Sequence, residues 1–336
     1  MAKRFVVTNL LRCLFVCLFV QACAAYEPGP VSADLTAAND GRIWFQTRDI
    51  YDFPDLSGPS PVRVIHGDLT LPEGPIRGAV ILSHGSGGPG ALHRRYARWL
   101  EDQGIATFLI DHFGPRNVGS TVRDQIRITE QGMMADVIAA QRLLASHPAL
   151  DPSRIGHIGW SKGASTGLLV AVDRFSALAG RDAPLAFVAG FYPFCGVDLS
   201  GERPISPLLL MIGENDDWTL PRTCVAAVAA LNASDTDARA EIDVYPGARH
   251  GFDSTSSGRT LSGAVTVRDD SPRCLLKADP DGAMQTLDGQ LNVSSLGTRV
   301  AYLRACGVRG VQYGGNADAR GASEVRLKAF IDRHLP

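Results

Sequence analysis

A serine lies at the end of a short apolar run, in a setting where its hydroxyl could act as a nucleophile. Residues 155–160 are apolar and lead into Gly159-Trp160-Ser161-Lys162-Gly163, after which small and apolar residues suited to a helix follow at once. Strand, tight turn and helix form the context in which G-x-S-x-G is a nucleophile elbow. Such a turn strains the serine backbone, and its glycines leave room for the neighbouring chain. Ser161 is therefore the predicted nucleophile.

A second G-x-S-x-G match overlaps the first, at Gly163-Ala164-Ser165-Thr166-Gly167. Ser165 would lie about one turn inside the helix, where a serine hydroxyl tends to bond back to a carbonyl. Ser161 is favoured over Ser165 because it lies at the end of the strand. The alternative is a glycine-rich turn that carries an ordinary serine.

An aspartate and a histidine follow the serine along the chain, each just after an expected strand. The apolar run 207–212 leads into Gly213-Glu214-Asn215-Asp216-Asp217-Trp218, and the run 241–245 is followed five residues later by His250. The order Ser161, Asp216, His250 is that of a nucleophile-elbow triad, with each member in a loop after a strand. A histidine so placed takes the serine proton, and the carboxylate orients it. Asp217 is a rival for the role of Asp216.

A glycine-rich loop precedes this triad in the chain. The apolar run 79–82 leads into Ser83-His84-Gly85-Ser86-Gly87-Gly88. In enzymes with a nucleophile elbow, one oxyanion donor comes from this loop and the other from the residue after the nucleophile. The predicted donors are the backbone N–H groups of Ser86 and Lys162. The alternatives are a plain turn and a phosphate loop, and the latter lacks its Gly-Lys-Ser/Thr ending.

The elements that must position these residues alternate along the chain. Strands are expected at 62–71, 79–82, 105–110, 155–160, 185–192, 207–212 and 241–245, and helices at 91–103, 124–146, 300–305 and 321–334. A turn at 72–75 suggests a hairpin. Alternating strands and helices predict one α/β domain with a mostly parallel, doubly wound sheet flanked by helices.

The amino terminus predicts export. Basic residues, the apolar run 13–20 and Ala22-Cys23-Ala24 are typical of a signal peptide at 1–25. A weakly hydrophobic N-terminal helix is the alternative, and Cys23 also lies in a lipobox-like sequence, so membrane attachment is expected only if Cys23 is lipidated. The mature protein would be periplasmic or secreted. Its net charge of −2 gives no reason to expect a nucleic-acid partner.

Beyond the signal peptide, residues 26–60 are expected to be an extension and 61–336 the catalytic domain, with an irregular, flap-like insertion at 253–295. Four cysteines remain, which in an exported chain predict two disulfides. Cys195 and Cys224 each follow a strand of the sheet, which favours their pairing and leaves Cys274 for Cys306. Free thiols are the alternative. The cysteines form no C-x-x-C pair, so the sequence gives no support for a metal site.

An ordered set of motifs resembles the dienelactone hydrolase family of α/β-hydrolases, in its exported bacterial branch. The set comprises HGSGG at 84–88, DHFGPR at 111–116, GWSKG at 159–163, FYPFC at 191–195, GENDDW at 213–218, RHGF at 249–252 and YGGN at 313–316. The resemblance implies an eight-stranded sheet, a nucleophile-His-Asp triad, and hydrolysis of an ester or lactone without a cofactor. It also favours Asp216 over Asp217, because the third position after Gly213 is the family's usual one.

Two departures from the founding members matter. Those members have cysteine where this chain has Ser161, and a glutamate in the loop that here carries His84-Gly85. A serine does not need that carboxylate, so the two changes agree with each other and make dienelactone a doubtful substrate. Arg116 resembles a family arginine that binds a substrate carboxylate. The other expected pocket residues are Phe113, Trp160, Tyr192 and Trp218.

These observations predict a serine hydrolase that cleaves a small ester or lactone through an acyl-enzyme. His250 would be the general base and Asp216 its orienting carboxylate. The competing interpretations are an acyltransferase or peptidase that uses the same triad, and a non-catalytic envelope protein that retains the fold.

Overall fold

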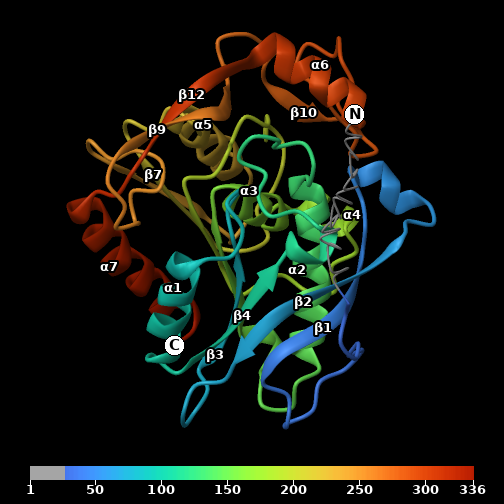
Figure 1. Ribbon diagram of the computed structural model, residues 1–336, viewed down its shortest axis with the longest axis vertical. Helices are drawn as coiled ribbons and strands as arrows, with labels where there is room; N and C mark the ends of the chain where they lie inside the picture. The colour runs from blue at the N-terminus through green and yellow to red at the C-terminus, as the bar shows by residue number, and fades with distance from the viewer. Residues whose placement is uncertain (1–26) are drawn as a thin grey trace, which may run out of the picture.

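A computed structural model describes residues 27–336, so the predicted signal peptide and Cys23 lie outside the described residues. An eight-stranded sheet in the order β1-β2-β4-β3-β5-β6-β7-β8 forms the centre of the molecule (Figure 1). Its strands are β1 (Gly41–Arg48), β2 (Val62–Thr70), β3 (Gly78–Ser83), β4 (Ile105–Asp111), β5 (Ile155–Trp160), β6 (Val188–Phe191), β7 (Leu208–Gly213) and β8 (Ala240–Tyr245). The six strands from β3 to β8 run parallel, which confirms the predicted α/β-hydrolase architecture.

Helices cover both faces of this sheet. Figure 1 shows α1 and α7 on one side and α2 on the other. The helices are α1 (Ala91–Glu101), α2 (Glu130–Ala145), α3 (Lys162–Val170), α4 (Asp173–Leu178), α5 (Pro221–Asn232) and α7 (Ala317–His334). Because both faces are covered, every residue of β3, β5 and β7 is buried, and this explains why these strands consist mostly of apolar residues.

The expected boundary at residue 61 is wrong. Residues 41–48 form β1, which pairs antiparallel with β2 and buries Ile43 and Phe45 in the main core. In the sequence only residues 43–45 form an apolar run, which is too short to indicate a strand of eight residues. The turn at 72–75 does not close a hairpin, since β2 pairs with β1 and β4 rather than with β3.

The expected irregular insertion contains regular structure. Residues 259–313, here called the cap, form β9 (Arg259–Val267), β10 (Leu276–Ala278), β11 (Met284–Thr286), α6 (Leu296–Cys306) and β12 (Gly307–Tyr313). Strand β9 pairs with β12, and β10 with β11. In Figure 1 this orange-to-red segment lies across one end of the sheet.

Two disulfides join Cys195 to Cys224 and Cys274 to Cys306, so the favoured pairing is confirmed. The first links the loop after β6 to α5. The second lies within the cap and links the segment between β9 and β10 to the end of α6. Disulfides persist in oxidising compartments, which is compatible with an extracellular or periplasmic protein. Among residues 27–336, no helix has the length and apolar character needed to cross a membrane.

Candidate active site

Ser161 connects β5 to α3 in a sharp turn. Its backbone has φ 50° and ψ −115°, a region that a residue with a Cβ rarely adopts. The glycines around it are required by close contacts. A Cβ on Gly159 would lie 2.2 Å from the Gly163 carbonyl oxygen, and a Cβ on Gly163 would lie 2.1 Å from the Ser83 carbonyl oxygen. The turn therefore has the geometry of a nucleophile elbow, with Ser161 at its tip.

Ser161, His250 and Asp216 form a continuous hydrogen-bonded chain. The Ser161 Oγ lies 3.0 Å from His250 Nε2, and His250 Nδ1 lies 2.8 Å from Asp216 Oδ2. Both His250 and Asp216 are buried. Because Nδ1 faces a carboxylate, it carries the ring proton, and Nε2 is left to accept the serine hydroxyl. His250 is thus within hydrogen-bond reach of both Ser161 and Asp216, the other two residues that the sequence assigns to a triad.

The Asp216 carboxylate is held by its own loop. Its Oδ1 accepts hydrogen bonds from the backbone N–H groups of Trp218 and Thr219, each at 2.9 Å. The Thr219 hydroxyl lies 3.0 Å from Asp216 Oδ2 and 3.1 Å from His250 Nδ1. Thr219 was not predicted from the sequence, although its place three residues after Asp216 in a turn is a usable signal. The rival Asp217 faces elsewhere and accepts a hydrogen bond from Gln312 N of β12 at 2.8 Å.

Two aromatic rings pack against the His250 imidazole. The Tyr192 and Trp218 rings have centroids 4.5 and 4.6 Å from that of His250. Beyond Tyr192 lies Asp253, a fully buried carboxylate that accepts hydrogen bonds from Tyr192 Oη and Trp160 Nε1, both at 2.8 Å. Burial raises the pKa of Asp253 even though these hydrogen bonds lower it. These bonds fix the ring that packs on His250.

The glycine-rich loop after β3 passes directly beside the nucleophile. A Cβ on Gly85 would lie 3.2 Å from Ser161 Cβ, so the loop backbone is in close contact with the serine. The loop is anchored from behind by His84, whose Nε2 accepts from His112 N at 3.2 Å and whose Nδ1 then donates to the Gly85 carbonyl at 2.8 Å. Burial holds the pKa of His84 well below its ordinary value, so its ring is neutral.

Lys162 and Ser165, both in α3 just after the nucleophile, make different contacts. Ser165 Oγ donates to the Ser161 carbonyl at 3.0 Å, the backward bond that was expected of it, and accepts from Phe194 N. The buried Lys162 ammonium lies 2.7 Å from Glu130 Oε1. Burial raises the pKa of Glu130, but this ammonium outweighs it and leaves the pKa below its ordinary value. Lys162 therefore brings a paired cation, not a free one, to the site.

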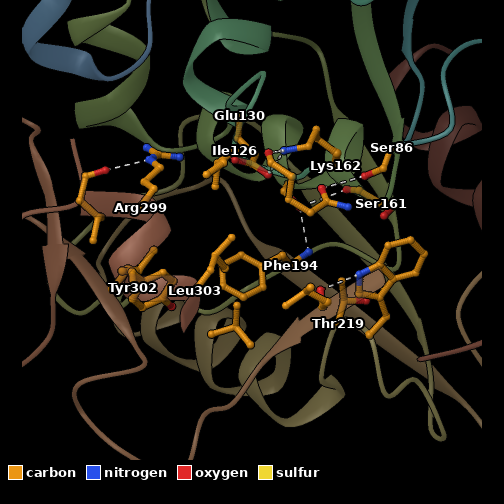
Figure 2. A pocket seen from close by; sticks show the side chains of 17 residues that line it. Ser86, Ile126, Glu130, Ser161, Lys162, Phe194, Thr219, Arg299, Tyr302 and Leu303 are labelled. Carbon is orange, nitrogen blue, oxygen red and sulfur yellow. Dashed lines mark hydrogen bonds and ion pairs between the residues drawn. The ribbon is translucent and has the colours of Figure 1, made fainter. Parts of the chain in front are cut away.

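A cavity of about 120 Å³ opens beside Ser161 (Figure 2). Ser86, Ser161 and Lys162 lie at one end of it, while Arg299 lies at the other. Phe194 and Trp218 contribute aromatic walls. Ile126 adds an apolar wall from outside the cap, and the cap supplies the others, which are Val265, Val267, Leu276, Val293, Tyr302 and Leu303.

Of the five side chains expected to line the pocket, Trp218 alone does so. Trp160 packs in the core against Phe191, with ring centroids 5.5 Å apart, and Tyr192 lies behind His250. Phe113 belongs to a small apolar cluster with Val118, Ile128 and Met133. Trp160, Tyr192 and Phe113 thus pack in the interior of the protein and not against the cavity.

Arg116 is also placed elsewhere, because its charge is already neutralised. Its guanidinium makes two hydrogen bonds of 2.9 Å to Asp136 and one of 3.1 Å to Asp49. Its side chain is 7% exposed and is not among the described residues that line the cavity at Ser161. The structure therefore gives no support to a role for Arg116 in binding a substrate carboxylate.

The sequence model of the Dienelactone hydrolase family matches residues 65–270. The chain belongs to this family. The match includes Ser161, Asp216 and His250 and ends inside the cap. Family membership supports a hydrolase of the ester-cleaving kind, and such enzymes act on small molecules.

Individual relatives are distant. Two uncharacterized proteins from strains of Mycobacterium tuberculosis are each 29% identical over 205 residues, which cover 56% of this chain and 68% of theirs. A dienelactone hydrolase of Anabaena variabilis is 22% identical, with a TM-score of 0.44, over 56% of this chain and 82% of that one. Esterase 2 of Thermogutta terrifontis is 17% identical, with a TM-score of 0.45, over 56% and 80%.

Proposed function

We propose that this protein is a serine hydrolase that cleaves carboxylic esters or lactones through an acyl-enzyme intermediate. The observation that carries the proposal is the chain of hydrogen bonds at 3.0 and 2.8 Å that joins Ser161 through His250 to Asp216. A serine held at positive φ at the end of a strand supports the same conclusion, because the strain is retained where the exposed hydroxyl is needed.

The first half of the reaction acylates the serine. Ser161 Oγ attacks the carbonyl carbon while its proton passes to His250 Nε2, and Asp216 stabilises the imidazolium that forms. The negative charge moves to the carbonyl oxygen, where the N–H groups of Ser86 and Lys162 would receive it. Each such donor contributes about 3 kcal/mol to the stability of the transition state. The C–O bond then breaks, and the alcohol leaves with the proton from His250.

The second half releases the acid. Water enters on the side that the alcohol has left, and His250 Nε2 takes one of its protons as the oxygen attacks the acyl carbon. The same two N–H groups would stabilise the second tetrahedral intermediate. Its collapse returns the proton to Ser161 Oγ and restores the free enzyme.

Labelling with a fluorophosphonate probe tests this proposal. The adduct on the purified mature protein is located by peptide mass spectrometry, beside the variants Ser161→Ala and Ser165→Ala. We expect an adduct on Ser161 that is lost in Ser161→Ala and still found on Ser161 in Ser165→Ala. A folded protein with both disulfides intact that takes up no probe would count decisively against a serine hydrolase.

A further inference from the structure

The far wall of the cavity at Ser161 is built by the cap. Figure 2 shows Tyr302 and Leu303 at a distance from the Ser161 end, and both belong to α6. Val293 precedes that helix and also lines the cavity. The family match ends at residue 270, so these three residues lie in a part of the chain that the family model does not cover.

The size of the cavity limits what can enter it. A volume of about 120 Å³ is slightly less than the roughly 150 Å³ of an apolar protein cavity that binds one benzene molecule. A chain of about four carbons therefore fills it. The walls are mainly apolar, and the charged Lys162 near Ser161 is neutralised by Glu130. The Arg299 guanidinium at the other end donates to the Val293 carbonyl and to the Gln131 side chain. An uncharged hydrocarbon group therefore fits the space between them best.

The placement of the catalytic groups indicates which half of the ester enters. Among the described residues, the cavity is lined by Ser161 and by both oxyanion residues, Ser86 and Lys162, whereas His250 does not line it. The departing alcohol must lie next to His250, because it receives its proton there. The cavity beside Ser161 and the oxyanion donors therefore suits the acyl half.

Hydrogen bonds and a disulfide hold the cap residues of the far wall in place. Tyr302 Oη donates to the Cys274 carbonyl at 2.7 Å, next to the Cys274–Cys306 disulfide. Leu276 N donates to the Gly196 carbonyl at 2.8 Å. Met284 N donates at 2.9 Å to the carboxylate of the buried Asp52, which lies outside the cap. The cap is thus attached to the domain on two sides and cross-linked within itself.

We propose that the cap selects the acyl group, and that the site takes esters of compact apolar acids of about four carbons, with Leu303 closing the far end of the cavity. This inference rests on the proposed function. A longer acyl chain would meet the Leu303 side chain, which the disulfide and the Tyr302 hydrogen bond hold in place. A shorter chain would leave part of the apolar wall unfilled.

Truncation of Leu303 tests the inference. The kcat/KM is measured for chromogenic esters of one alcohol with acyl chains from acetate to decanoate, in the wild type and in Leu303→Ala. The matched control is Leu296→Ala, because Leu296 lies on the same helix but is 57% exposed and outside the cavity lining. We expect the octanoate-to-butyrate ratio to rise about 10-fold in Leu303→Ala, the effect of one or more methylenes in an apolar pocket. It should stay at the wild-type value in Leu296→Ala.

Further measurements separate the possible failures. Leu303→Phe narrows the cavity, so it should shift preference from butyrate toward acetate, and active-site titration corrects for any loss of folded protein. An octanoate-to-butyrate ratio that does not change in Leu303→Ala, or changes equally in Leu296→Ala, overturns the inference. The inference is also overturned if Leu303→Ala changes the selectivity among butyrate esters of different alcohols and leaves the acyl-chain preference unchanged. A wild-type protein that neither hydrolyses an ester nor reacts with fluorophosphonate overturns the proposed function itself.

Discussion

Two adjacent carboxylates after β7 differ in what they face, and this difference decides their roles. Asp216 receives two backbone N–H groups on one oxygen and the His250 imidazole on the other. Asp217 instead accepts a backbone N–H of β12, on the side of the cap. A carboxylate that is already oriented by its own loop can hold the imidazole in one tautomer without further rearrangement. From the sequence, Asp216 was favoured over Asp217 only because its position is the one usual in the family.

This contrast gives a matched pair of substitutions. Asp216→Asn keeps the size of the side chain but removes the charge that orients and stabilises the imidazolium, so we expect kcat to fall by about 10⁴-fold. Asp217→Asn retains an oxygen that can accept from Gln312 N, so its kcat should stay within about threefold of the wild type. Steady-state hydrolysis of a short-chain ester measures both. Equal losses in the two variants, or a larger loss in Asp217→Asn, would show that the triad carboxylate is assigned wrongly.

At the scale of elements, the elbow depends on the contact between α3 and the end of β3. Gly163 lies in the first turn of α3, against the Ser83 carbonyl. We expect Gly163→Ala to destabilise the fold by about 3 kcal/mol, because a methyl group there must displace backbone. The control is Gly321→Ala in α7, where an added Cβ meets nothing within 4 Å. A helical glycine of this kind should gain up to about 1 kcal/mol as alanine.

Denaturation with guanidinium measures both free energies of unfolding. Active-site titration then reports how much of the Gly163→Ala protein still reacts with the probe. If Gly163→Ala were as stable and as reactive as the wild type, the close packing of the elbow against β3 would be incorrect.

Most of the sheet and the triad could be predicted because their signals are local. A run such as β7 is apolar throughout, and the polar residues that follow it must lie at the same edge as those after its parallel neighbours. The cap could not be predicted in this way. Its strands β9 and β12 pair residues that are 40 to 54 positions apart, from Val267 with Gly307 to Arg259 with Tyr313. Both strands are only partly buried, so neither shows a clear alternation.

The direction in which side chains point at the strand ends also could not be predicted from the sequence. Tyr192 follows β6 at φ 44°, which turns its side chain behind His250 and toward Asp253 instead of into the cavity. Trp160 immediately precedes Ser161, yet it points into the core. A sequence pattern places such residues near the site, but the backbone angles of each turn decide whether they face the substrate.

At the scale of the whole molecule, burial of uncharged histidines makes the fold sensitive to acid. Burial lowers the pKa of His157 to about 3 and that of His93 to about 4, and it also lowers that of His84. In the unfolded chain a histidine titrates near pH 6.5. Below that pH the unfolded state binds protons that the native state does not, so stability is complete above pH 6.5 and falls as the pH decreases toward the folded pKa.

This linkage predicts how steeply the free energy of unfolding falls with pH, and replacing either histidine should make that slope smaller. Between pH 6 and 4.5, each such histidine lowers the free energy of unfolding by about 1.4 kcal/mol per pH unit. His157→Gln and His93→Gln should each reduce the slope of the wild type by that amount, because glutamine binds no proton in either state. Guanidinium denaturation at several pH values measures the slope, and its change is independent of how much each variant loses in absolute stability. A variant with the wild-type slope would mean that the histidine it replaces is already protonated in the native protein at these pH values.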